Sequence, residues 1–256
     1  MIPMRAYELM KETFYRRTYI WIVHAVWLAL YGSFWWFFLP EMPEMGRFLF
    51  IWGGFFLALA LSAGIFGDDI ASGRICILVT KPFWTGELYI YRLLGLSVQA
   101  AAHLVLTGGV ILVLHALTRK GNTDGLGVWL LATWLLFNTC AALSTSLSII
   151  VGRAFNSLLL LVIIATGYFT MGLLMTYLRQ EATSGVLWSF IRYPWPPFEM
   201  LYKLAAGEWG QYALTVGHYS VTKSVACVVH SLMLTLVYSI MGILLLSRRE
   251  YSRVRD

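Results

Sequence analysis

The sequence predicts an all-α polytopic membrane protein with about six transmembrane helices, in a single transmembrane domain that covers residues 1–256. Hydrophobic residues make up 59% of the chain and charged residues only 12%, and the mean hydropathy is +0.70. A water-soluble fold could not bury that much apolar surface. The apolar residues also fall into blocks of about twenty, which is the length of an α-helix that spans a bilayer.

An amphipathic segment comes first. Met4, Tyr7, Met10 and Phe14 recur at helical spacing, with charged residues between them. This pattern predicts an N-terminal interfacial helix on the cytoplasmic side, and a simple basic flank to the first span is the alternative.

Six predicted spans follow, and the first is bracketed by aromatic residues such as Trp21 and Trp35, as interfacial belts are. Its apolar run is too long for the core of a signal peptide, and no small-residue cleavage site follows, so we expect it to be retained. The predicted spans are residues 19–39, 48–66, 93–117, 127–151, 157–178 and 224–247.

The orientation follows from the basic residues. With a cytoplasmic N-terminus, 12 of the 19 Lys and Arg residues fall in cytoplasmic segments and 7 in outer segments. We therefore expect both termini to be cytoplasmic. The same loops explain the net charge of +6, so nucleic acid is not an expected partner. Cys76, Cys140 and Cys227 show no metal-binding or disulfide spacing, and we expect them to be reduced.

The segment between the second and third spans is too polar for the membrane core; it reads GDDIASGRICILVTKPFWTGELYIYRLLG from Gly67 to Gly95. Acidic residues at its start favour a helix N-terminus, which predicts a short helix over residues 70–79. Pro82 is expected to stop that helix, and Thr85 to cap the next, with Glu87 in its first turn. A helix that lies along the membrane surface there could transmit a displacement of a soluble partner to two spans at once.

This segment resembles the coupling loop of the ABC type-2 transporter permease family. That loop has one or two acidic residues, Ser-Gly, a Leu-rich run, a Pro, a Glu and a basic residue before the next span. The positions that match here are Asp68, Asp69, Ser72, Gly73, residues 75–78, Pro82, Glu87 and Arg92. Two positions depart from the pattern, because Arg74 replaces a small hydroxyl residue and Thr85 replaces an Arg.

The resemblance implies the membrane-spanning subunit of an ATP-driven ABC exporter in the cell inner membrane. It implies an ABC-type ATPase subunit as partner and a second membrane subunit, identical or different. ATP and Mg would bind that ATPase, since this chain has no GxxxxGK[ST] loop and no cofactor is expected on it. We expect the ATPase to contact the coupling segment at Asp68, Asp69, Gly73, Lys81, Pro82, Glu87 and Arg92.

The cargo is expected to be lipid-like or amphipathic, because no charged residue lies deep in a predicted span. Hydroxyl residues of the fourth span, such as Thr139 and Ser146, suit helix packing, and lining a substrate path is the alternative. His24, His103, His115 and His230 lie in spans but far apart, which favours neutral, hydrogen-bonded histidines over a proton relay.

Three further expectations concern the outer side and the class of protein. Short outer helices are expected between the fifth and sixth spans, over residues 186–192 and 198–204, with a surface loop as the alternative. A mechanical transmitter to a periplasmic partner, which moves no cargo, would show the same coupling segment. A polytopic membrane enzyme is the third reading, although no HExxH, GxSxG or clustered catalytic set occurs, and we expect the chain not to be an enzyme.

Overall fold

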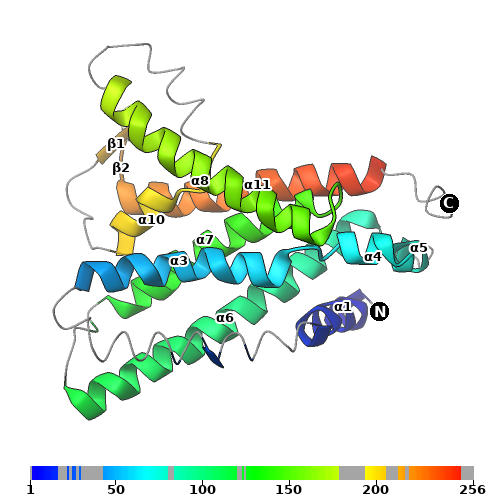
Figure 1. Cartoon of the computed structure of the whole chain (residues 1–256), viewed down its shortest axis with the longest axis horizontal. Coiled ribbons are helices and arrows are strands. Elements are labelled where there is room, and N and C mark those ends of the chain that lie inside the picture. Colours follow the sequence, from blue (N-terminus) through cyan, green and yellow to red (C-terminus); the bar gives the residue numbers. More distant parts are fainter. Residues whose placement is uncertain are drawn as a thin grey trace.

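The computed structural model describes residues 2–16, 43–79, 84–119, 125–178, 194–205, 213–216 and 219–248, and the single positions 22, 25, 26, 29 and 123. The elements within these ranges are α1 (Ile2–Arg16), α3 (Pro43–Ser62), α4 (Gly67–Ala71), α5 (Arg74–Val79), α6 (Thr85–Thr118), α7 (Leu126–Leu147), α8 (Arg153–Leu178), α10 (Phe198–Ala205), β1 (Ala213–Val216), β2 (Tyr219–Thr222) and α11 (Lys223–Arg248). Figure 1 shows their arrangement.

The chain is a helical membrane protein. Among the described residues, four helical stretches are long and apolar enough to cross a bilayer. They are Trp52–Ala71, which runs from within α3 through α4, and Thr85–Thr118, Leu126–Leu147 and Val225–Arg248. They correspond to the second, third, fourth and sixth predicted spans. Helix α8 covers the fifth, and its apolar described part is Arg153–Ala165. The first predicted span, residues 19–39, lies outside the described residues apart from four single positions.

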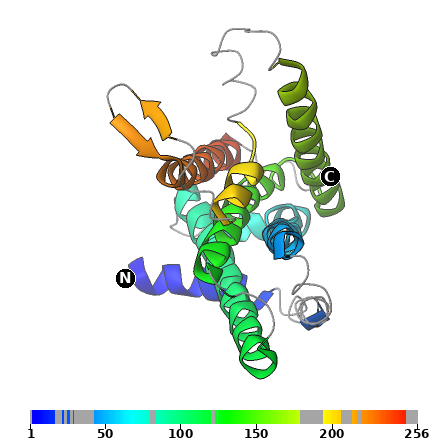
Figure 2. The same ribbon diagram turned by 90° about the vertical axis from the view of Figure 1, so that its left-hand side faces the viewer.

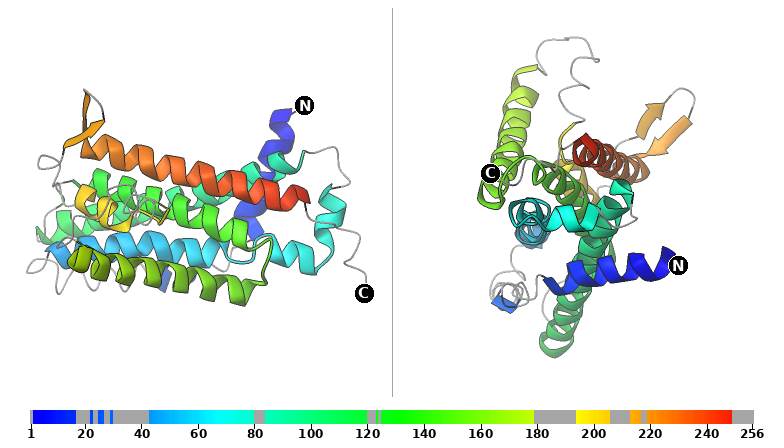
Figure 3. Two further views of the ribbon diagram at one scale, coloured as in Figure 1. Left: turned by 90° about the horizontal axis from the view of Figure 1, so that it is seen from above. Right: turned by 90° about the vertical axis from the view of Figure 1, so that its right-hand side faces the viewer.

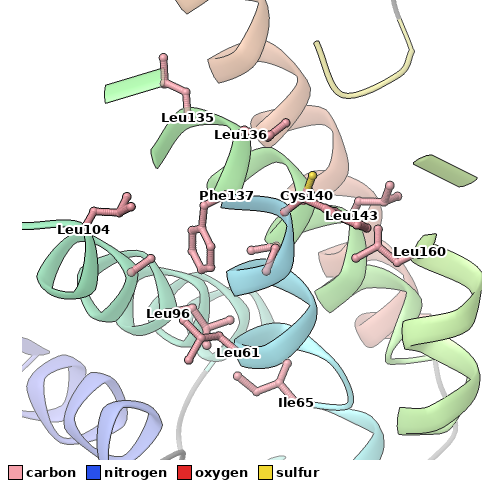
Figure 4. Close-up of a cluster of buried hydrophobic side chains, with 14 of the residues drawn as sticks. Leu61, Ile65, Leu96, Leu104, Leu135, Leu136, Phe137, Cys140, Leu143 and Leu160 are labelled. Atoms are coloured by element: carbon pink, nitrogen blue, oxygen red, sulfur yellow. The ribbon is translucent and has the colours of Figure 1, made fainter. Parts of the chain in front are cut away.

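Helix α7 forms the centre of the bundle, in contact with α3, α6, α8, α10 and α11. Buried side chains cover most of its surface, and Figure 4 shows Leu136, Phe137 and Leu143 of α7 among leucines from α3, α6 and α8. Helices α3 and α7 approach closely at Gly54, where an added Cβ would lie 2.5 Å from the carbonyl oxygen of Thr133. A small residue at the crossing permits that approach, as is usual in membrane bundles.

The two ends of the bundle carry different elements. Helices α1, α4 and α5 and the C-terminal end of α11 lie at one end, which we call the α4/α5 end (Figure 1). Helix α10 and the β1–β2 hairpin lie at the other, which we call the α10 end. Helix α1 runs across the bundle axis rather than along it, as Figures 2 and 3 both show.

Helix α6 is longer than the predicted third span. Its 34 residues extend about 51 Å, against a hydrocarbon core of roughly 30 Å. The first turns, from Thr85 to Arg92, therefore extend beyond the span predicted at residues 93–117, toward the α4/α5 end. The predicted helix from residue 85 into the third span is confirmed, and Glu87 lies in its first turn.

Two local predictions in the coupling segment are wrong. Residues 70–79 do not form one helix, because a turn at Ser72 and Gly73 separates α4 from α5. Gly73 has a φ of 68°, which favours glycine, and the Ser72 hydroxyl donates a hydrogen bond to the Asp68 carbonyl oxygen at 2.7 Å. Thr85 is not the N-cap of α6 either, since Trp84 occupies that position without a side-chain capping bond.

The α10 end holds a short buried helix and a hairpin. Phe198, Leu201 and Leu204 on α10 are buried, and the Phe198 ring lies 4.6 Å from that of Trp52. In this part of the predicted outer segment the helix packs into the bundle instead of lying on the surface, whereas residues 186–192 lie outside the described ranges. Strands β1 and β2 pair antiparallel, with Ala213 opposite Thr222. The all-α prediction missed this hairpin, although its Thr, Val and Tyr residues favour strands.

Candidate functional site at the α4/α5 end

A buried ion pair joins α4 to α6. One Nη of Arg92 lies 2.8 Å from Oδ2 of Asp69, and both side chains have no exposed surface. The Arg92 guanidinium also lies 5.9 Å from the centre of the Phe66 ring, within cation–π range. Two buried charges are tolerated when each neutralises the other, so the position of α4 depends on this pair.

Helix α1 joins the same cluster through Glu12. Its carboxylate lies 2.7 Å from Arg74 of α5 and 3.6 Å from Arg92. The helix can approach α6 because Gly95 has no side chain, and an added Cβ there would lie 3.1 Å from the Met10 carbonyl oxygen. We call Glu12, Asp69, Arg74 and Arg92 the charge cluster. It connects α1, α4, α5 and α6.

The start of α4 also contacts the connection between α7 and α8. The backbone N–H of Phe66 donates a hydrogen bond to the Ser148 hydroxyl at 3.3 Å. A Cβ added at Gly67 would lie 3.0 Å from the Ser148 carbonyl oxygen, so the two backbones are close. Asp68 lies on a different side of α4 from Asp69, and its carboxylate lies 4.0 Å from Arg153.

The predicted contact residues thus fall into four groups. Asp69 and Arg92 face each other inside the chain and their side chains have no exposed surface, and their contact with an ATPase stays a prediction. Asp68 and Glu87 keep exposed surface. Gly73 lies at the α4–α5 turn, where it supplies the positive φ. Lys81 and Pro82 lie outside the described residues.

Sequence reasoning missed three members of this site. Glu12 was read as part of an interfacial helix and Arg74 as a departure from the family pattern, yet they pair with each other. Trp84 received no role, although 64% of its surface is exposed beside the first turn of α6. A large exposed aromatic residue next to charged groups is the type of side chain that anchors protein interfaces.

The site holds ion pairs and an exposed aromatic side chain, an arrangement suited to transmitting force or docking a protein. Among the residues that the structure describes, no group of three or more His, Cys, Asp or Glu side chains is placed to bind a metal ion. Compared with known sequences, the chain matches no protein-family model and no curated protein.

Proposed function

We propose that this chain is the membrane-spanning permease subunit of an ATP-driven ABC transporter, coupled through residues 67–92 to a separate ATPase. The observation that carries the proposal is the way α4 and α5 are held. They lie in the chain between two membrane-length helices, α3 and α6, and ion pairs of the charge cluster connect them to α6 and α1. A displacement of α4 and α5 by a soluble motor would therefore move several helices together.

The surface offered to the ATPase consists of exposed groups around this segment. Asp68, Glu87 and the Trp84 ring are accessible at the α4/α5 end, and Lys81 and Pro82 belong to the same stretch of sequence. Asp69 and Arg92 act behind this surface, by fixing α4 on α6. The resemblance to the family implies that this end lies on the cytoplasmic side of the inner membrane, with both termini on that side. It also implies a second membrane subunit in the assembly.

A lipid-like or amphipathic cargo fits the interior of the bundle. Two buried hydroxyls of α7, those of Thr139 and Ser146, bond to backbone carbonyl oxygens of α11. Charged side chains among the buried residues are confined to the α4/α5 end, at Asp69 and Arg92, within the described ranges. Such an interior favours apolar cargo over a strongly charged one.

Copurification tests the proposal. An ABC-type ATPase should be recovered with the wild-type protein after mild extraction. The Glu87→Lys variant should lose it, because truncating or reversing one charge at a desolvated contact costs about 2 to 5 kcal/mol. Glu8→Lys, a matched reversal on the exposed part of α1, should retain it. If no such ATPase accompanies the wild type, the proposed function is wrong; retention by Glu87→Lys alone removes Glu87 from the interface.

A mechanical transmitter is the second candidate function. The β1–β2 hairpin contacts α11 at the α10 end, where it could receive a protein partner. Reconstituted vesicles separate the two candidates. ATPase activity that rises with an amphipathic cargo supports transport, whereas activity that rises only with a periplasmic protein supports transmission.

A further inference from the structure

Tyr89 lies where three helices meet inside the bundle. It belongs to α6, and its hydroxyl lies 3.0 Å from the Ala142 carbonyl oxygen and 2.9 Å from the Ser146 hydroxyl, both on α7. Helix α11 crosses at Gly242, where an added Cβ would collide with the Tyr89 ring and with Ser146. The ring is fully buried. Tyr89 therefore has one well-defined position, fixed by α7 and α11 together.

From Tyr89, hydrogen bonds lead toward the α10 end. The Ser146 hydroxyl donates to the backbone carbonyl oxygen of Tyr238 on α11 at 2.7 Å. The Tyr238 hydroxyl in turn donates to the carbonyl oxygen of Pro194, four residues before α10 begins. The single proton of the Tyr89 hydroxyl lies between two acceptors, the Ala142 carbonyl oxygen and the Ser146 hydroxyl, while Ser146 donates its own proton to Tyr238.

From the same residue, ring contacts lead toward the α4/α5 end. The Tyr89 ring stacks on Phe66, with centroids 5.6 Å apart and planes 7° apart. The Phe66 ring also lies 5.9 Å from the Arg92 guanidinium, which pairs with Asp69. Phe66 directly precedes α4, so a shift of α4 would move the ring that lies against Tyr89.

We propose that Tyr89 is a positioning residue that couples the charge cluster to the Pro194–α10 segment at the opposite end of the bundle. The series Asp69, Arg92, Phe66, Tyr89, Ser146, Tyr238 and Pro194 is continuous, and each step is a polar or ring contact. The groups from Asp69 to Ser146 are buried, and the last contact, between the Tyr238 hydroxyl and Pro194, is exposed. Packed cores respond to displacement by rearranging. A change in the Asp69–Arg92 pair therefore alters the position of Tyr89 and, through its hydrogen bonds, that of α10. Under the proposed function this series would link the motor side to the outer side.

Hydrogen exchange of residues 194–205, in the purified full-length protein in nanodiscs, tests this coupling without any ATPase. Its outcome is therefore separate from that of the copurification experiment. Two changes perturb the cluster: Asp69→Asn, and the milder Glu12→Gln, which leaves the Asp69–Arg92 pair in place. Each should raise exchange in residues 194–205 by about threefold or more, since coupling across such distances changes equilibria by modest factors.

The decisive comparison uses double variants. Tyr89→Phe removes the hydroxyl and keeps the ring, and in that background Glu12→Gln should no longer alter exchange at residues 194–205. Tyr91→Phe, the same change two residues along α6, should leave the response intact, and Ser146→Ala should abolish it as Tyr89→Phe does. The proposal is overturned if Glu12→Gln has no effect in the wild type, or if its effect is as large in the Tyr89→Phe background. A merely structural role of Tyr89 would raise exchange in the single variant and leave the response to Glu12→Gln unchanged.

Discussion

Asp68 and Asp69 are adjacent in the sequence, yet they have opposite environments. Successive residues on a helix point about 100° apart, so Asp69 faces α6 and Arg92 while Asp68 faces solvent and Arg153. A buried carboxylate is stable here because a guanidinium lies 2.8 Å away. The same carboxylate group therefore contributes very different amounts to the free energy of unfolding at two neighbouring positions.

The change Asp69→Asn should destabilise the protein by about 3 to 5 kcal/mol, because it leaves the buried Arg92 charge without its neutralising carboxylate. Asp68→Asn, the matched change at a partly exposed pair, should cost about 0 to 1 kcal/mol. Thermal unfolding of the two variants in detergent measures the difference. Equal melting temperatures would show that the Asp69–Arg92 pair does not hold α4 in place.

The residues of the charge cluster mark the limit of sequence reasoning. Asp69 and Arg92 could be selected because both lie in a polar stretch beside a span, but burial depends on how α4 folds back on α6. Glu12 and Arg74 lie 62 residues apart, and nothing local indicates that α1 docks at Gly95. Tyr89 is one of two tyrosines in an apolar helix, so its neighbours on α7 and α11 could not be predicted from its surroundings in the chain.

At the scale of elements, the helices were predictable and their ends were not. Blocks of apolar residues indicate membrane-length helices because length and hydropathy are local properties. The break between α4 and α5 depends on Gly73 adopting a positive φ, which the sequence permits without requiring. Burial of α10 depends on the space that α3, α7 and α11 leave for Phe198, and no local pattern defines that space.

Crossings between helices depend on glycines, and Gly242 on α11 provides a sharp test. An added methyl group would meet the Tyr89 ring and Ser146, neither of which can move without breaking contacts. Gly242→Ala should cost about 1 to 3 kcal/mol, as overpacking does. Gly109 on α6 has nothing within 4 Å of an added Cβ, so Gly109→Ala should be neutral or stabilising by up to about 1 kcal/mol through helix propensity.

Denaturation in mixed micelles compares the two glycine variants directly. Because both changes add one methyl group to a membrane-spanning helix, the contribution of helix propensity cancels. The difference in unfolding free energy between the two variants then measures the cost of a methyl group at the helix crossing. A Gly242→Ala protein as stable as Gly109→Ala would mean that α11 can move away from α6 without loss. The Tyr89 position would then be less tightly fixed than the hydrogen bonds indicate.

At the scale of the whole molecule, the placement of the ends relates the fold to the membrane. Helix α1, helices α4 and α5 and the end of α11 share one end of the bundle (Figure 1). The excess of basic residues, 12 against 7, belongs to the predicted segments on that side. The positive-inside rule then predicts that the α4/α5 end faces the cytoplasm, independently of any resemblance to a family.

Labelling of introduced cysteines tests this orientation. In a background without Cys76, Cys140 and Cys227, Glu8→Cys and Arg153→Cys should be protected in intact cells from a thiol reagent that cannot cross the membrane. Thr123→Cys and Glu208→Cys, in the predicted outer segments, should react. All four should react once the membrane is permeabilised, since Glu8 and Arg153 are exposed in the structure. Labelling at Arg153→Cys in intact cells, with protection at Thr123→Cys, would invert the orientation and place the charge cluster outside, where no ATPase could reach it.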